Sequence, residues 1–191
     1  MIGSILFVIL LIISIFAYIY FNGMVSREET VDSQWAQVEN VYQRRADLVK
    51  NLVNVVKGYA THEQTTLTEV IEARSKATSV TIDPSKLDDA AIQNFQQVQD
   101  GLSSALSKLM VVVEAYPNLK ANEGFLKLQA QLEDTEDQIT AERFKFNEVA
   151  KDYNTYIRKF PKNLFASLFG FDKKAYFKAE AGSEVAPDAT F

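Results

Sequence analysis

The chain has 191 residues, of which 47% are hydrophobic, 24% charged and 12% aromatic, which is enough apolar material for one domain with or without an appendage. It has no cysteine and one histidine, which excludes disulfides, zinc–thiolate sites, cysteine nucleophiles and sites built from two imidazoles. Its 7 Gly and 4 Pro are too few for the turns of an all-β sandwich, and its net charge of −5 has the wrong sign for a nucleic-acid binder.

The N-terminus begins with an apolar run. Residues 2–21 contain no charged side chain, and as a helix they are about 30 Å long, the thickness of a bilayer's hydrocarbon core. The run lacks the basic leader and cleavage site of a signal peptide, and it is longer than most buried core helices. We therefore expect residues 1–26 to form a single transmembrane anchor. The side chains expected in the lipid or at its aromatic border are Ile2, Phe7, Leu11, Phe16, Tyr18, Tyr20 and Phe21.

Basic residues follow this run, and none precedes it. Arg27 is the nearest, and Arg44, Arg45 and Lys50 come later. Because basic flanks favour the cytoplasmic side, the sequence predicts a cell-membrane protein with its N-terminus outside and the following domain in the cytoplasm.

The next segment has the pattern of a long helix. From residue 25 to about residue 80, apolar residues recur every three or four positions, a spacing typical of helices in coiled coils and bundles. Gly23 could act as a swivel between this helix and the anchor. Asp83 and Pro84 have the residue types of a cap and a first helical position, and they mark the start of a second helix.

Proline residues end the later helices. Pro117 ends the second helix, because proline cannot continue the hydrogen-bond ladder. A third helix is expected from Phe125 to Phe160, where Pro161 closes it, and Asn163 is expected to cap a short fourth helix.

Short loops make successive helices antiparallel, so the predicted fold class is all-α. A transmembrane helix is followed by an elongated antiparallel bundle of three or four helices, over residues 27–177. Residues 178–191 lack periodicity and are expected to form a flexible tail. In an up-down-up bundle the first and third long helices run parallel, which places residue 160 at the end remote from the membrane.

Polar residues interrupt the apolar stripes of these helices. They are Arg45, Glu63, Glu136 and Arg143. A guanidinium on a packed stripe needs an acceptor, so we expect Arg45 and Glu136 to form a buried or half-buried ion pair, with Arg143 as a competing partner. The alternative is that each side chain extends to water at the edge of the bundle.

No catalytic motif stands out. His62 and Glu63 begin like a zinc-protease helix, but the chain has no second histidine. The acidic run 133–137 lies on a helix, where consecutive side chains diverge and cannot converge on one cation. We expect no enzymatic activity, metal or cofactor, with an unrecognised carboxylate site as the alternative.

Aromatic residues gather near the C-terminus, in the segment 160–177. They could form a membrane-interface element or a docking patch. Because helix direction places residue 160 far from the membrane, a short return helix that closes the bundle is the favoured interpretation.

Two blocks of residues carry a family resemblance. Between Trp35 and Glu63 stand WAQV, RRADLV, NLV, VKGYA and HE, and between Tyr116 and Phe171 stand YPNLKANEGF, TE, DYN, FP and FGF. In this order they resemble the LemA family of bacterial membrane proteins. The chain departs from the family pattern at Lys50, where proline is usual, and at Phe146, where tyrosine is usual.

The resemblance implies a membrane-anchored helical bundle with no established active site, and some relatives are linked to the formation of membrane compartments. We expect a non-enzymatic scaffold or adaptor that self-associates, with a membrane-shaping protein that polymerises on the bilayer as the alternative. The expected partners are the lipid bilayer, through residues 2–21, further copies of the chain, and an unidentified membrane or cytoplasmic protein, but no nucleic acid.

Overall fold

The computed structural model describes residues 2–60 and 62–178. The helices are α1 (Ile2–Lys57), α2 (Gln64–Ser79), α3 (Asp89–Val113), α4 (Pro117–Lys120), α5 (Glu123–Arg158) and α6 (Lys162–Phe169), with a 3-10 turn, η1, at Pro84–Lys86. The all-α class is therefore confirmed, since these described ranges contain no strand. Apart from Lys178, the predicted tail 178–191 lies outside the described residues.

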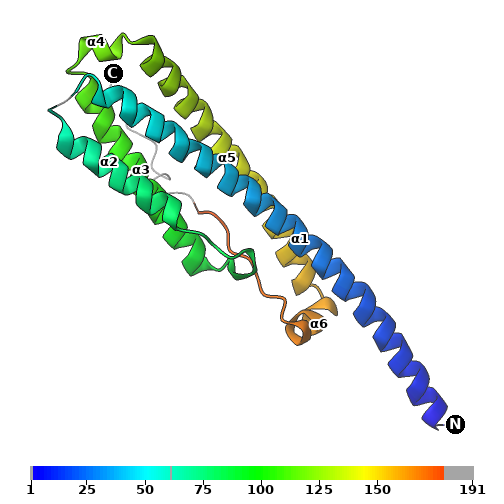
Figure 1. The fold of residues 1–191 in the computed structure, drawn as a ribbon. Helices are drawn as coiled ribbons and strands as arrows, with labels where there is room; N and C mark the ends of the chain where they lie inside the picture. Colours follow the sequence, from blue (N-terminus) through cyan, green and yellow to red (C-terminus); the bar gives the residue numbers. More distant parts are fainter. Residues whose placement is uncertain (1, 61, 179–191) are drawn as a thin grey trace, which may run out of the picture.

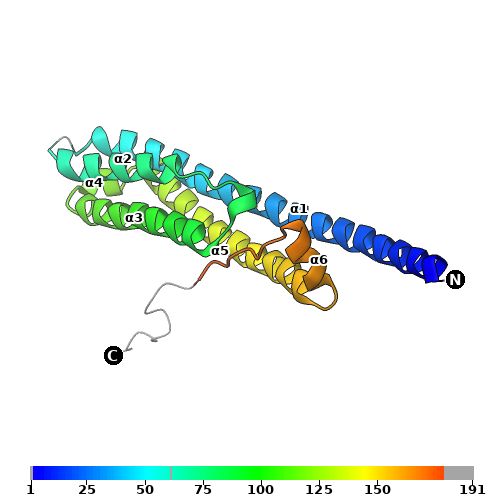
Figure 2. The same cartoon turned by 90° about the horizontal axis from the view of Figure 1, so that it is seen from below.

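Four helices, α1, α2, α3 and α5, form an elongated bundle in which successive helices run in opposite directions (Figures 1 and 2). The two longest, α1 and α5, lie side by side. Their ion pairs Arg27–Asp152, at 3.0 Å, and Arg44–Asp134, at 3.5 Å, show that they are antiparallel. The N-terminal part of α1 extends beyond the bundle on its own (Figure 1).

The helix predicted from residue 25 to about residue 80 is in fact two helices. α1 ends at Lys57, and the chain reverses before α2 begins at Gln64. Apolar spacing does not reveal the reversal, because Val56 of α1 and Val70 of α2 pack in the same core. Gly58, a poor helix former, is the local signal of the break.

This additional reversal changes the direction of α5. The expectation that the first and third long helices run parallel is wrong, because α5 descends toward the anchor while α1 leaves it. The end of α5, Phe160 and α6 therefore lie at the anchor end of the bundle and not at the remote end (Figure 1).

Local capping agrees only partly with the sequence. The side chains of Asp88 and Asn122 accept hydrogen bonds from backbone amides in the first turns of α3 and α5, at 2.8 and 3.0 Å. Asp83 caps the short turn η1 and not the long helix. α6 begins at Lys162 without a side-chain cap, so the expectation that Asn163 caps it is wrong.

The core consists of two apolar clusters along the bundle axis. The one nearer the anchor surrounds Trp35, whose ring centroid lies 5.2 Å from that of Phe95, 5.5 Å from that of Phe146 and 5.9 Å from that of Phe177. The more distant cluster contains leucines and valines of α1, α2 and α3. Between the clusters lie polar side chains at the level of Arg45.

Candidate functional site

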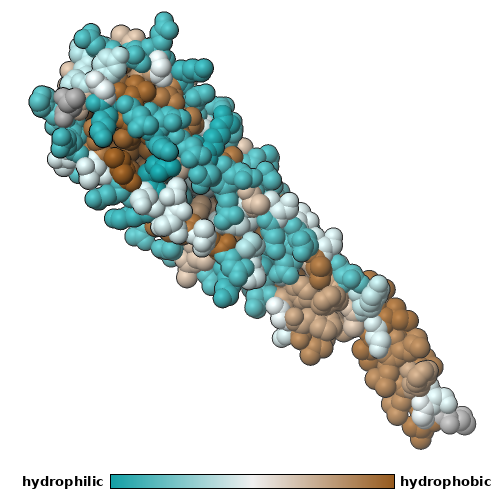
Figure 3. Space-filling view, in the orientation of Figure 1, coloured by the Kyte–Doolittle hydropathy of each residue, from teal (hydrophilic) through white to brown (hydrophobic). Residues whose placement is uncertain are grey.

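The first candidate site is the apolar end of α1. α1 is long and apolar enough to cross a membrane, and none of its most apolar stretch is buried in the protein. All seven predicted anchor residues lie on the apolar run 2–21, where Tyr20 is half-buried and the others are exposed. Figure 3 shows this end as a continuous hydrophobic surface.

The predicted boundary of the anchor, after residue 26, falls inside the packed bundle. Met24 is fully buried in the core around Trp35. A β-carbon on Gly23 would overlap the hydroxyl of Tyr156, so a larger residue there would force this side chain of α5 to move. α1 continues unbroken through Gly23, which therefore serves as a packing position and not as a swivel.

Aromatic side chains join α6 to the end of the apolar run. The Phe165 ring lies 5.5 Å from that of Tyr20, and Phe21 has the rings of Phe169 and Phe171 at 5.3 and 5.6 Å. The expectation that this aromatic segment lies far from the membrane is therefore corrected. α6 lies beside the predicted membrane border.

The second candidate site is a polar layer in the middle of the bundle, made by Arg45, Gln99, Ser103 and Glu136. The Arg45 side chain is 3% exposed, and its Nη1 donates to Glu136 Oε1 at 3.0 Å and to Ser103 Oγ at 3.1 Å. Nη2 donates to Gln99 Oε1 at 2.5 Å. The predicted pair is thus present, and it is half-buried, because the Glu136 side chain is 49% exposed.

The polar layer connects all four long helices. Arg45 belongs to α1, Gln99 and Ser103 to α3, and Glu136 to α5. The Gln99 amide also donates to the carbonyl of Ala77 on α2, at 3.2 Å. Buried polar groups that are satisfied only in one alignment favour that alignment, so this layer favours a single register of the four helices.

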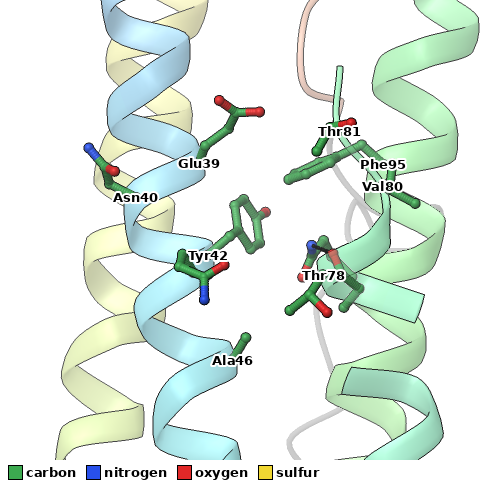
Figure 4. A pocket seen from close by; sticks show the side chains of 11 residues that line it. Glu39, Asn40, Tyr42, Ala46, Thr78, Val80, Thr81 and Phe95 are labelled. Carbon is green, nitrogen blue, oxygen red and sulfur yellow. Dashed lines mark hydrogen bonds between the residues drawn. The ribbon is translucent and has the colours of Figure 1, made fainter. Parts of the chain in front are cut away.

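A pocket of about 250 Å³ opens beside the polar layer. Glu39 and Tyr42 from α1 face Thr78, Val80 and Phe95 across it (Figure 4). Burial raises the pKa of both the Glu39 carboxyl and the Tyr42 phenol. The pocket is smaller than the roughly 300–1,000 Å³ of typical small-molecule sites. Among the described residues no group of three or more metal-type ligands converges.

The other two predicted polar residues lie elsewhere. Glu63 precedes α2 in the reversal after α1 and accepts a hydrogen bond from the Tyr116 hydroxyl at 3.0 Å. Arg143 donates to the carbonyl of Lys178 at 3.0 Å, and its guanidinium lies 4.9 Å from the ring centroid of Phe177. Of the four residues, only Arg45 and Glu136 come together.

Of the short return helix expected in the segment 160–177, only Lys162–Phe169 is helical, so the helical expectation is wrong for residues 171–177. The segment 171–178 runs as extended chain between the helices, held by two asparagines of α5. The Asn154 side chain accepts from the Lys174 amide at 3.0 Å and donates to its carbonyl at 2.8 Å. Asn147 makes the same pair of bonds to Phe177, both at 2.9 Å. Ala175 and Phe177 are buried while Tyr176 between them is exposed, which is the alternation expected of an extended segment.

Lys174 is a buried charged residue that the sequence analysis did not single out. Its side chain is 3% exposed, and its Nζ lies 2.9 Å from Glu28 Oε1 and 3.1 Å from the carbonyl of Pro84. Nearby, burial raises the pKa of the Asp32 carboxyl, which the positive charge of Lys174 opposes. This buried cation ties the C-terminal segment to α1 and η1.

Comparison with known families gives a clear match. A sequence model of the LemA family matches residues 34–191. The chain belongs to the LemA family. The LemA match begins on α1 beyond the apolar run, and it includes the polar layer and the two asparagines that hold the C-terminal segment.

Curated relatives agree with this membership. The magnetosome protein MamQ of Magnetospirillum gryphiswaldense is 26% identical over 86% of this chain and 67% of its own length. MamQ 2 of Paramagnetospirillum magneticum is 25% identical, with the same coverage. Protein LemA of Metamycoplasma hominis is 25% identical over 95% of this chain and 80% of its own length.

Proposed function

We propose that this LemA-family chain is a non-enzymatic, single-pass membrane protein whose bundle acts as a scaffold. The observation that carries the proposal is the continuity of α1, which is bare and apolar at one end and forms a wall of the core at the other. Leu, Ile, Phe and Val each favour insertion by about 0.3–0.6 kcal/mol at the centre of a span, and residues 2–21 hold no charge that opposes it.

The bundle suits a scaffold because it is elongated and its helices are held together by the polar layer. From residue 22 to Lys57, α1 extends about 54 Å beyond the apolar run. The polar layer favours one register of the four helices, and the family resemblance offers no active site. A partner bound near α4 would be held at a set distance from the bilayer.

We place the bundle in the cytoplasm. Arg27 is the first charged residue after the apolar run, and Arg44 and Arg45 follow on the same helix. Lys159 and Lys162 lie at the same end of the folded bundle, which adds to the positive charge on this side.

Membrane fractionation tests the anchor. The full chain should stay in the membrane pellet after alkaline carbonate extraction, whereas a chain lacking residues 1–19 should be soluble and keep its helical circular dichroism. Release of the full chain by carbonate would refute the membrane span. An unfolded truncated chain would show that the apolar run is instead part of the core.

Thiol labelling tests the orientation, because the chain has no cysteine of its own. Val111 is 73% exposed on α3 and suits a Val111→Cys variant. This cysteine should be shielded from a membrane-impermeant maleimide in intact cells and should react after lysis. Labelling of intact cells would place the bundle outside.

A second candidate function is membrane shaping by polymerisation on the bilayer. The similarity to magnetosome proteins favours it, since some members of this family are linked to membrane compartments. The mass of the full chain in lipid nanodiscs and in mild detergent separates the two proposals. Open-ended assemblies support shaping, a closed oligomer supports a self-associating scaffold, and a monomer counts against both forms of self-association.

A further inference from the structure

α6 carries two apolar faces, and the structure covers only one of them. Phe165 and Phe169 contact Tyr20 and Phe21 on α1. On the other side lie Leu164 and Leu168, which are 60% and 75% exposed and, four residues apart, share one side of the helix. Phe160, in the turn just before α6, is 81% exposed. We call these three residues the α6 outer face.

Contacts with α1 determine where the α6 outer face lies relative to the apolar run. Because α6 packs on Tyr20 and Phe21, it lies at the end of the charge-free run, where the proposed span meets water. In Figure 3 a second apolar patch, where Figure 1 places α6, lies next to the exposed end of α1. The two apolar surfaces are thus neighbours on one side of the molecule.

Cations border the α6 outer face. Lys159 and Lys173 are exposed on the segments before and after α6, and Lys162 lies in its first turn. The Lys162 ammonium lies 3.7 Å from the ring centroid of Tyr156, and the guanidinium of Arg27 lies 3.8 Å from the same centroid. Apolar side chains bordered by lysines and by aromatic rings match the composition of helices that lie in a membrane interface.

We infer that α6 is a monotopic membrane-binding element, whose outer face lies among the headgroups and upper acyl chains of the bilayer that α1 spans. The inference rests on the proposed function, because it takes residues 2–21 to be in the membrane. An interfacial helix buries its apolar face by about 5–10 Å, while its lysines reach anionic phosphates. The chain thus contacts lipid at two separate places.

A lipid surface fits this face better than a second copy of the chain. The face lies next to the apolar end of α1, at the level where that helix meets the proposed interface. Only three large side chains are exposed on it, which gives a small area for a stable protein interface. Its lysine border suits an anionic membrane surface, whereas two copies of the same border would repel each other.

The test uses nitroxide labels on single cysteines in the full chain, which has no native cysteine. The variants are Leu168→Cys on the α6 outer face, Ile12→Cys in the proposed span, and Val111→Cys on α3 as a matched control of similar exposure. Each is placed in nanodiscs of phosphatidylcholine and phosphatidylglycerol, with one chain per disc. Collision with lipid-soluble oxygen and with a water-soluble nickel chelate is measured for each label.

The expected result is a several-fold loss of nickel collision at Leu168 relative to Val111, with oxygen collision higher at Leu168 and highest at Ile12. If the Leu168 label is as open to nickel as the Val111 label while Ile12 is protected, the inference is overturned and the span stands. If Ile12 is also open to nickel, the proposed function fails. Protection of Leu168 that requires two chains per disc assigns the face to a second copy and overturns the inference.

Discussion

Arg45 and Glu136 allow the polar layer to be tested quantitatively. We expect Arg45→Met to lower the free energy of unfolding by about 2–3 kcal/mol, because Gln99 Oε1 and neighbouring acceptors lose a buried charged donor. Glu136→Gln should cost only about 1 kcal/mol, since it keeps an acceptor at a side chain that is 49% exposed. In the Arg45→Met background, Glu136→Gln should cost almost nothing.

The two single variants and the double variant therefore give an expected coupling of about 1 kcal/mol. The assay is urea unfolding followed by circular dichroism, in the chain lacking residues 1–19. The ion pair Arg44–Asp134 is a matched control on the same two helices, because its side chains are 48% and 59% exposed and its coupling should be near zero. A coupling of Arg45 and Glu136 below about 0.5 kcal/mol, or no larger than the control, would refute the reasoning.

Three further predictions concern other contacts. Asn154→Leu should cost about 2–4 kcal/mol, because two buried backbone groups of Lys174 lose their partner, and it should expose the C-terminal segment to limited proteolysis. Gly23→Leu should lower the thermal midpoint of the full chain in micelles, since its side chain would overlap Tyr156, whereas Gly3→Leu, which has open space around it, should not. Burial raises the pKa of Asp32, so its ionised form opposes folding and stability should fall as pH rises through that pKa; Asp32→Asn should remove this fall in pH-dependent unfolding.

Helix ends were predictable where one residue has a steric or capping effect. Pro117 and Pro161 cannot continue a helix from the preceding residues, and α3 and α5 end at Val113 and Arg158, just before them. Both prolines instead stand at the start of the next helix, α4 and α6. The reversal after Lys57 has no such residue. Gly58 weakens a helix without ending it, and the apolar spacing continues because α1 and α2 face the same core.

The Arg45–Glu136 contact was predictable even though the direction of α5 was not. Arg45 precedes the end of α1 by about as many residues as Glu136 follows the start of α5, so antiparallel helices bring them to the same height. Both residues also lie near the middle of the bundle, where parallel helices would bring them to the same height as well. Because the buried guanidinium of Arg45 needs an acceptor, Glu136 at the same height is its expected partner.

The C-terminal segment was beyond sequence reasoning for a physical reason. Its conformation depends on Asn147 and Asn154, side chains that lie 20 to 30 residues earlier in the chain. Seven residues of helix and three residues of extended chain both span about 10 Å, so the two asparagines match Phe177 and Lys174 in spacing. Local patterns contain no information about such a match until the helix and the segment are placed together.

Because α1 is one continuous helix from the apolar run into the bundle, a tilt of its N-terminal part would also tilt the bundle. A membrane span that is too long for a thin bilayer accommodates the mismatch by tilting. Because α1 passes through Gly23 without a hinge and is tied to α5 there, the tilt is transmitted to the bundle. Over an arm of about 54 Å, a tilt of about 10° displaces the α4 end sideways by about 9 Å. With residues 2–21 in the membrane, as proposed, a change in bilayer thickness would therefore move a surface far from the lipid.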